Sequence, residues 1–294
     1  MRIAINGNRH QEGHFEDIDR LVTALLKRGD SIVMAQRFLD YLTSRLGEKF
    51  AIGLDYIPLT QQPQADLAIS IGGDGAFLKT ARWIGDRPTP IAGINTGHLG
   101  YLSAFTFERP ADIRSALIEG HYRVEQRSLL SVEVSGGGIP ESQLPVTALN
   151  ELAITRGDTS AMLRIEAVIN RCSSLNYIGD GLIISTPTGS TAYNLSVGGP
   201  ILDPELAGWV LSPIAAHSLS MRPLVVKDSS VLEISVQTRG ENYRIAADGK
   251  PFTLPIGATL RITRAPYPVN LVLQPEHSFT DTLRTKLGMG ASGI

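Results

Sequence analysis

The sequence predicts an α/β N-terminal domain with a parallel, Rossmann-like sheet, followed by a β-rich, β-sandwich-like C-terminal domain. In the first part of the chain, apolar strand-like runs alternate with amphipathic helical patterns, which indicates a parallel sheet covered by helices. Short strand-like segments separated by Gly, Pro, Asn and Asp follow, and they indicate a β-rich domain. We expect the α/β domain at residues 1–108, completed by a C-terminal segment returning at about 267–294, and the β-rich domain at 109–266.

The strands and helices of the first domain follow from the periodicity of apolar residues. Strands are expected at residues 2–6, 31–35, 67–71 and 90–94. Helices are expected at residues 14–28, 38–46, about 75–85 and 110–120. Gly29 is a stop signal after the first helix, and Pro110 suits the first position of the last one. In such sheets ligands bind beyond the carboxyl ends of the strands, where we expect Asp74 and Asn95.

The second domain shows a different pattern. Strand-like segments are expected at residues 124–134, 163–170, 182–185, 223–226, 231–236, 243–247 and 259–263. Glycines 136–138, followed by Pro140, predict a surface hairpin. The chain then returns to a helical pattern at residues 278–287, which we expect to pack on the first domain.

Composition excludes several classes of protein. The 294 residues are 43% hydrophobic and carry a net charge of −2, so no basic field points to a nucleic-acid or membrane partner. Cys172 is the single cysteine, which excludes an internal disulfide and a cysteine-based zinc site. The N-terminus does not read as a signal peptide, and no run approaches the ~18 apolar residues of a membrane helix. We therefore expect a cytoplasmic protein.

Two familiar nucleotide-binding signatures fail. The Gly249-Lys250 pair lacks the preceding glycine of a P-loop, since Arg244 occupies that position. The string from Gly288 to Gly293 matches a dinucleotide fingerprint, but it follows a helical pattern instead of a strand.

The run Gly72-Gly73-Asp74-Gly75 lies between the strand at 67–71 and the start of a helix. Glycines at the end of a buried strand, opening a helix, are a common phosphate site, because the helix N-terminus favours negative charge. A carboxylate repels phosphate, so Asp74 makes sense if it faces a hydroxyl that loses its proton while attacking phosphorus. A tight turn in which Asp74 caps the helix explains the same residues. From this run alone both interpretations stay open.

The most informative stretch spans residues 179–200. An apolar strand runs into small and hydroxyl residues, Thr186-Pro187-Thr188-Gly189-Ser190-Thr191-Ala192-Tyr193. Such a segment allows a backbone to approach a ligand closely and offers uncharged hydrogen-bonding groups. The ring of Tyr193 is suited to stacking on a base. A Ser/Thr-rich turn that caps a short helix is the alternative.

In this order, residues 72–75, Asn150-Glu151 and the 186–193 string resemble the NAD kinases. The strings Gly93-Ile94-Asn95 and Gly97 to Leu102 are also similar to that family, as is Leu219 to Leu224. The resemblance covers nearly the whole chain, to Lys286-Leu287-Gly288. The glycine-Asp run is shared with diacylglycerol kinase-like and 6-phosphofructokinase-like enzymes, so the 186–193 string is the discriminating piece.

The resemblance implies transfer of phosphate from ATP to the 2′-hydroxyl of the adenosine ribose of NAD, giving NADP. It makes Asp74 the general base, with Asp74 and Gly75 also touching NAD, and makes Gly72, Gly73 and Gly75 the donor-phosphate loop. The remaining dinucleotide contacts implied are Lys79, Asn150, Glu151, Asp180, Thr191, Ala192, Tyr193, Asn194, Leu195 and Ser196. Lys79 lies one helical turn after Asp74, where it either reaches a phosphate or is simply solvated. Asp180-Gly181 and Asp248-Gly249 also read as hairpin turns.

The resemblance further implies a divalent cation, expected to be Mg²⁺, on the donor phosphates, although the sequence shows no ligand cage for it. It implies a homodimer or tetramer with shared sites, to which Asp180 is delivered from a neighbouring subunit. A lipid or sugar kinase would share residues 72–75, and a non-catalytic NAD sensor would keep the dinucleotide contacts. The sequence leaves open ATP or polyphosphate as donor, use of NADH, oligomer size, feedback regulation and the metal ligands.

Overall fold

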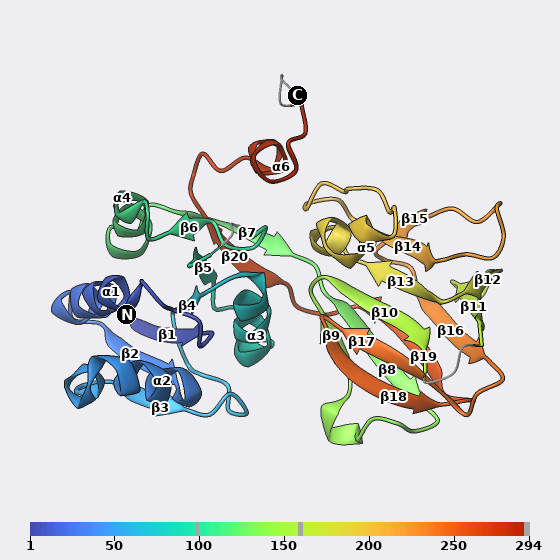
Figure 1. The fold of residues 1–294 in the computed structure, drawn as a ribbon, viewed down its shortest axis with the longest axis horizontal. Helices are drawn as coiled ribbons and strands as arrows, with labels where there is room; N and C mark the ends of the chain where they lie inside the picture. Colours follow the sequence, from blue (N-terminus) through green and yellow to red (C-terminus); the bar gives the residue numbers. More distant parts are fainter. Residues whose placement is uncertain (98–99, 158–160, 291–294) are drawn as a thin grey trace. The chain divides into compact units, whose positions relative to one another are not determined.

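The computed structural model describes residues 1–97, 100–157 and 161–290 (Figure 1). It consists of two compact units. Unit 1 combines Met1–Gln126 with Val269–Ile294, and unit 2 is Arg127–Pro268. Unit 2 is therefore inserted into unit 1, whose sequence is completed by the C-terminal segment.

Unit 1 is built on an eight-stranded sheet. Its strands are β1 (Arg2–Gly7), β2 (Ser31–Ala35), β3 (Asp55–Ile57), β4 (Leu67–Ile71), β5 (Ile91–Asn95), β6 (Phe105–Thr106), β7 (Arg123–Arg127) and β20 (Val269–Leu273). The order is β3-β2-β1-β4-β5-β20-β7, and β6 pairs with β5. The pairs β1–β2, β1–β4 and β4–β5 are parallel. Every residue of β4 and β5 is buried, as expected for a parallel sheet covered on both faces.

The helices of unit 1 are α1 (Phe15–Lys27), α2 (Gln36–Leu46), α3 (Asp74–Ile84), α4 (Pro110–Ile113) and α6 (Phe279–Leu287). In α1 the apolar spacing places Ile18, Leu21, Val22 and Leu25 on one buried face. The expected helix at 110–120 begins at Pro110, but after α4 it widens into a π-helical turn, Arg114–Ile118. The predicted α/β architecture is confirmed.

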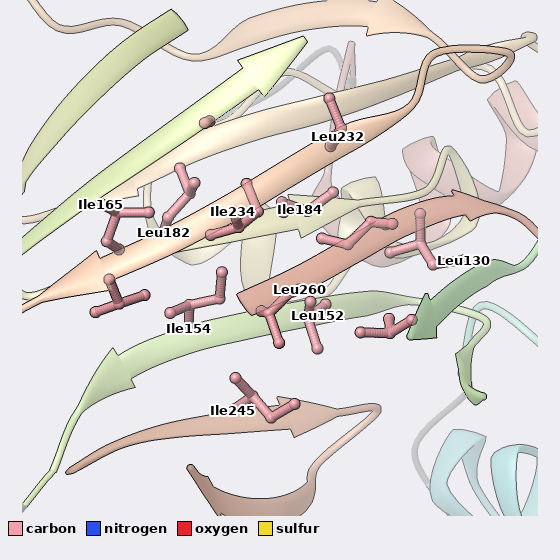
Figure 2. Close-up of a cluster of buried hydrophobic side chains, with 14 of the residues drawn as sticks. Leu130, Leu152, Ile154, Ile165, Leu182, Ile184, Leu232, Ile234, Ile245 and Leu260 are labelled. Carbon is pink, nitrogen blue, oxygen red and sulfur yellow. The ribbon is translucent and has the colours of Figure 1, made fainter. Parts of the chain in front are cut away.

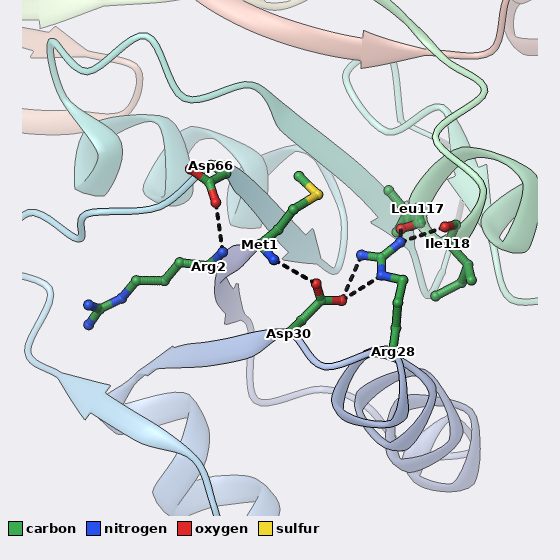
Figure 3. A network of polar contacts seen from close by, with 7 residues as sticks. All are labelled: Met1, Arg2, Arg28, Asp30, Asp66, Leu117 and Ile118. Carbon is green, nitrogen blue, oxygen red and sulfur yellow. Dashed lines mark hydrogen bonds and ion pairs between the residues drawn. The ribbon is translucent and has the colours of Figure 1, made fainter.

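A partly buried ionic network ties the N-terminus to this turn (Figure 3). The Asp30 carboxylate accepts hydrogen bonds from the N-terminal ammonium of Met1 at 3.0 Å and from Arg28 Nε at 2.7 Å. Arg28 Nη1 also donates to the carbonyl oxygens of Leu117 and Ile118, both at 2.6 Å. The guanidinium therefore satisfies two carbonyl groups at the end of the π-helical turn, which otherwise lack helical partners.

Residues 109–126, which the sequence assigned to the second domain, fall in unit 1. The reason is backbone pairing: β7 joins the unit 1 sheet beside β20. The strands of unit 2 follow β7 directly in the sequence. The β-rich sequence pattern therefore begins with β7, a strand of unit 1, before the boundary between the compact units at residues 126–127.

Unit 2 contains two six-stranded sheets. One has the order β15-β14-β13-β10-β17-β18, and the other β12-β11-β16-β19-β8-β9. The strands of the first are β10 (Glu151–Arg156), β13 (Gly181–Ser185), β14 (Gly208–Ile214), β15 (Leu224–Lys227), β17 (Asn242–Ala247) and β18 (Lys250–Pro255). Those of the second are β8 (Leu130–Ser135), β9 (Val146–Ala148), β11 (Leu163–Ile169), β12 (Ser173–Gly179), β16 (Leu232–Gln237) and β19 (Thr259–Arg264).

Side chains from both sheets form one core (Figure 2). Leu152 and Ile245 come from the first sheet, and Ile234 and Leu260 from the second; none is more than 1% exposed. In β16, β17 and β19 buried residues alternate with less buried ones, because successive side chains of a strand point to opposite faces. The predicted β-sandwich-like domain is therefore confirmed.

Candidate active site

The Gly72–Gly75 run forms the connection from β4 to α3 in unit 1. Gly72 has a φ of 136°, and a Cβ there would lie 2.8 Å from the Asn8 side chain and 2.9 Å from Ala76 Cβ. Only glycine combines this φ with so little space. Among the described residues, no hydrogen bond is made to the backbone N–H groups of Gly73, Asp74 and Gly75. These groups open α3, so they can donate to an anion at the helix N-terminus.

The Asp74 carboxylate is held by the loop that follows β5. It accepts hydrogen bonds from the backbone N–H of Tyr101 at 2.7 Å and of Leu102 at 3.0 Å. A Cβ at Gly100 would collide with this carboxylate, so the loop approaches it closely only because residue 100 is glycine. Each carboxylate oxygen accepts one of these bonds and keeps a second lone pair. His98 and Leu99 of the same loop lie outside the described residues.

A polar pocket of about 410 Å³ lies within unit 1 beside this loop. Its lining comes from the segment after β5 and from the C-terminal segment, and includes Asn95, Gly97, Gly100, Tyr101, Glu108, Arg109, Asp112, Glu276, His277, Asp281 and Lys286. The Lys286 ammonium of α6 lies 4.2 Å from the centroid of the Tyr101 ring. Burial lowers the pKa of Lys286 to about 8, while the negative charge of Asp74 opposes that shift.

Sequence reasoning gave no role to Tyr101 or Lys286, although both lie in strings that resemble the family. Tyr101 links the two charged groups, because its backbone N–H binds Asp74 and its ring contacts Lys286. Burial, and then the charge of Asp74, raises the pKa of Tyr101. By contrast Lys79 is exposed on α3.

In unit 2, Asn150-Glu151 and the 186–193 string lie side by side at one end of two paired strands. Glu151 opens β10 and is paired with Ser185, the last residue of β13. The Thr186 N–H donates to the Asn150 carbonyl at 2.9 Å, and the Thr186 hydroxyl donates to the Leu149 carbonyl at 2.5 Å. The structure therefore brings these two predicted sets together.

The small residues of the string serve packing within the unit. A Cβ at Gly189 would collide with the Asn150 carbonyl oxygen. Ser190 is fully buried, and its hydroxyl oxygen accepts the Leu202 N–H at 3.0 Å. The sequence predicted that this segment lets a backbone approach a ligand closely. At Gly189 the group that approaches closely is the Asn150 carbonyl, just before β10.

Tyr193 opens the short helix α5 (Tyr193–Ser196), and its side chain is 42% exposed. Its backbone N–H lies close enough to the Glu151 carboxylate to lower the pKa of that group, so the aromatic residue adjoins the Asn150-Glu151 pair. Burial, and then the nearby Asp248 carboxylate, raises the pKa of Glu151 to about 7, while the backbone N–H of Tyr193 opposes this shift.

The other residues of the segment differ in what they can offer a ligand. Asn194 is fully buried, and its amide nitrogen donates to the carbonyls of Ser190 at 3.1 Å and Pro200 at 3.0 Å. Its amide oxygen accepts the Ser212 hydroxyl at 2.6 Å, so this side chain supports the segment from within. Thr191, Ala192 and Leu195 are half-buried, and Ser196 is exposed.

Asp180 lies apart from this group within unit 2. It occupies the turn between β12 and β13, where its carboxylate is 3.4 Å from Arg156 Nη1. The antiparallel register pairs Thr155 with Gly181 at this end and Glu151 with Ser185 at the other. Four residues of strand separate the two ends, about 13 Å at 3.3 Å per residue. One chain alone therefore does not bring Asp180 to the Glu151–Tyr193 cluster.

Among the residues that the structure describes, no group of three or more His, Cys, Asp or Glu side chains could hold a metal ion. No helix in residues 1–97, 100–157 and 161–290 is both long and apolar enough to span a membrane.

Comparisons with known proteins cover both units. Residues 8–122 match the ATP-NAD kinase N-terminal domain, and residues 149–274 match the ATP-NAD kinase C-terminal domain. An NAD kinase of Porphyromonas gingivalis is 39% identical over 293 residues, which is 99% of each chain. An NAD kinase of Bacteroides fragilis is 40% identical over 291 residues, again 99% of each chain.

Two solved structures share the fold. Yeast NADH kinase complexed with NADH has a TM-score of 0.87 at 22% identity, covering 100% of this chain and 89% of that one. An NAD kinase from Archaeoglobus fulgidus in complex with ATP has a TM-score of 0.73 at 23% identity, covering 98% and 99%.

Proposed function

Because the chain belongs to the NAD kinase family, we propose that it transfers a phosphoryl group from ATP to the 2′-hydroxyl of the adenosine ribose of NAD, giving NADP. The observation that carries the proposal is the held carboxylate of Asp74, placed at the start of α3 beside backbone N–H groups that have no partner among the described residues. A helix N-terminus attracts phosphate, and a carboxylate beside it is useful when a hydroxyl must lose its proton.

In this proposal Asp74 accepts the proton of the 2′-hydroxyl. A carboxylate is a far weaker base than an alkoxide, so the proton moves as the oxygen attacks phosphorus and not before. Two backbone N–H bonds fix the direction of the carboxylate, and a base so oriented loses little freedom when the substrate arrives. Gly75, adjacent to Asp74 and exposed, offers its N–H to either substrate.

The donor phosphates bind the Gly72–Gly75 loop through its N–H groups in this proposal. A divalent cation, expected to be Mg²⁺, supplies charge neutralisation on the donor phosphates. Mg²⁺ commonly binds through substrate phosphates and one or two carboxylates, and this fits a described chain without a three-ligand cluster. Lys79, exposed on α3, is a further candidate contact to NAD, through a phosphate of the dinucleotide.

On the acceptor side, we assign the nucleoside of NAD to Asn150, Glu151 and Tyr193. The half-exposed ring of Tyr193 offers a stacking face, and the adjacent pair offers polar groups. Thr191, Ala192, Leu195 and Ser196 contribute from the same segment, and Asn194 supports it. We assign Asp180 to a ribose as a residue delivered by a neighbouring subunit, so its role depends on a homo-oligomer.

The test is an assay of purified protein with NAD, ATP and Mg²⁺, in which NADP is detected by an NADP-specific dehydrogenase. Parallel reactions replace ATP by polyphosphate and NAD by NADH. If no donor yields a 2′-phosphorylated dinucleotide, the proposed function is wrong.

The role of Asp74 is tested by Asp74→Asn in the same assay. General-base catalysis is typically worth ~10²–10⁴-fold, so kcat should fall by at least ~10²-fold. Asp17→Asn is the matched control, because Asp17 also lies in the first turn of a unit 1 helix. Near-normal turnover of Asp74→Asn would show that another group takes the proton.

A further inference from the structure

Asp248 makes contacts that a hairpin turn does not require. It lies between β17 and β18 with a φ of 46°. Its carboxylate turns back toward the start of β10 and accepts the backbone N–H groups of Leu149 at 2.8 Å, Asn150 at 2.7 Å and Glu151 at 3.3 Å. Its own N–H donates to the Glu151 carbonyl at 3.1 Å. Successive N–H groups that converge on one anion fix the backbone that carries them.

The backbone fixed in this way is the one that the 186–193 string packs against. The Asn150 carbonyl accepts the Thr186 N–H and closes the space around Gly189. The Glu151 carboxylate in turn lies near the backbone N–H of Tyr193, which lowers its pKa. A displacement of residues 149–151 would therefore move the whole cluster to which we assign the nucleoside.

The negative charge of Asp248 also affects the protonation of Glu151, because it raises the pKa of that carboxyl group. Glu151 is 8% exposed, and its Oε2 has no hydrogen-bond partner among the described residues. Two groups shift its pKa besides burial: the Asp248 carboxylate from the β17–β18 turn and the Tyr193 N–H from α5. Neutral Ser185 is its register partner across the strand pair on β13. A buried carboxylate oxygen without a partner, beside a second carboxylate, is suited to a hydroxyl or amino group of a ligand.

We propose that Asp248 is a positioning residue that holds the Asn150-Glu151 pair in place for the dinucleotide and couples dinucleotide affinity to pH. The inference rests on the proposed function, because it takes residues 150–151 as contacts to NAD. Ionised Glu151 accepts a hydrogen bond from the nucleoside, and protonation removes an acceptor. Burial and Asp248 raise the pKa of Glu151 to about 7, so binding weakens as the pH falls below 7. If only the ionised form binds, Kd rises toward tenfold per pH unit there.

The experiment measures the Kd of NAD by titration calorimetry at pH 6, 7 and 8 for the wild type and for Asp248→Asn. Asparagine adopts a positive φ readily, so the turn is kept. The amide nitrogen of the asparagine cannot accept a backbone N–H that a carboxylate oxygen of Asp248 accepts in the wild type. Because one hydrogen bond is lost, we expect the Kd of NAD at pH 8 to rise about tenfold, which corresponds to 1.4 kcal/mol. Loss of the Asp248 charge lowers the pKa of Glu151, so the weakening in acid should move to lower pH.

Asp203→Asn is the matched control, since Asp203 is an exposed turn residue of unit 2 whose carboxylate accepts one backbone N–H, that of Glu205. It should leave Kd and its pH dependence unchanged. Glu151→Gln should remove the acid weakening altogether. An Asp248→Asn protein with the wild-type Kd at all three pH values would overturn the inference.

Two outcomes separate this inference from the proposed function. A wild type that does not bind NAD at any pH would refute the proposed function. A wild type that binds NAD with the same Kd from pH 6 to pH 8 would leave the function intact and overturn the coupling to pH. The second result stands even if Asp248→Asn fails to fold.

Discussion

Asn194→Asp offers a direct test of whether Asn194 supports the protein from within or serves a ligand. The wild-type amide nitrogen donates to two carbonyl groups, and the amide oxygen accepts the Ser212 hydroxyl, in a fully buried position. An ionised aspartate keeps the bond from Ser212 but directs an oxygen at the two carbonyls. A protonated aspartic acid restores one of the two donors. The substitution should therefore be tolerated better in acid.

The expected magnitude follows from burial. Even when protonated, the variant loses one donor, at about 1 kcal/mol. Full burial raises the pKa of a carboxyl group by up to 3–5 units, and a shift of about 3 units corresponds to about 4 kcal/mol at pH 8. Since the folded pKa lies above the unfolded value of ~3.9, stability is retained below about pH 4 and lost as the pH rises through the folded pKa. The total of about 5 kcal/mol at pH 8 should lower Tm by about 10–20 °C.

Thermal unfolding followed by circular dichroism at pH 4.5 and pH 8 measures the difference. The control is Asn170→Asp, in an exposed turn where the amide oxygen accepts the Val231 N–H and a carboxylate can do the same. Its Tm should stay within about 2 °C of the wild type, as for most surface substitutions. If Asn194→Asp unfolds like the wild type at pH 8 while its affinity for NAD falls, Asn194 is a ligand contact and the reasoning is refuted.

Three further outcomes are expected. Tyr193→Ala should weaken NAD binding about 10-fold through lost stacking, as measured by calorimetry. The control Tyr56→Ala removes an exposed aromatic side chain of unit 1 and should leave NAD binding unchanged. An equal loss of affinity in both variants would contradict a specific role of Tyr193. Asp74→Asn should lower the pKa of Lys286 further below its value of about 8, because the Asp74 charge opposes the effect of burial on that lysine. NMR titration of the methylated lysine measures the pKa. An unchanged pKa would show that the two groups do not interact electrostatically. Gly100→Ala should lower kcat at least about 10-fold, because the added Cβ would displace the Asp74 carboxylate. A variant with the wild-type kcat would refute the close approach.

Periodicity in the sequence was enough to predict the central part of the unit 1 sheet. The expected strands at 31–35 and 67–71 coincide with β2 and β4, since their apolar runs are fully buried and bounded by turn residues. Strand β18, which contains Pro251 and Pro255, is not among the segments expected from the sequence. Proline is tolerated at a sheet edge, and β18 is an edge strand in its sheet. Which strand lies at an edge is decided by tertiary pairing and cannot be read from local pattern.

In the candidate site, too, some residues could be predicted from the sequence and others could not. Asp74 and Tyr193 lie in local strings, so sequence could single them out, and their assigned roles remain predictions. Lys286, Gly100 and Asp248 matter through partners far away in the chain: Lys286 through Tyr101, Gly100 through Asp74, and Asp248 through residues 149–151. No local spacing reveals such partners.

The place of β20 in the sheet has a consequence for how the chain reaches its folded state. β20 lies between β5 and β7, although it follows all of unit 2 in the sequence. During synthesis the edge of β5 that later pairs with β20 is therefore covered only by the two-residue strand β6 until residues 269–273 have been made. An open strand edge of apolar residues is prone to pair with other chains. Chains truncated before β20 should therefore aggregate, and a chaperone that shields strand edges should raise the yield of folded protein.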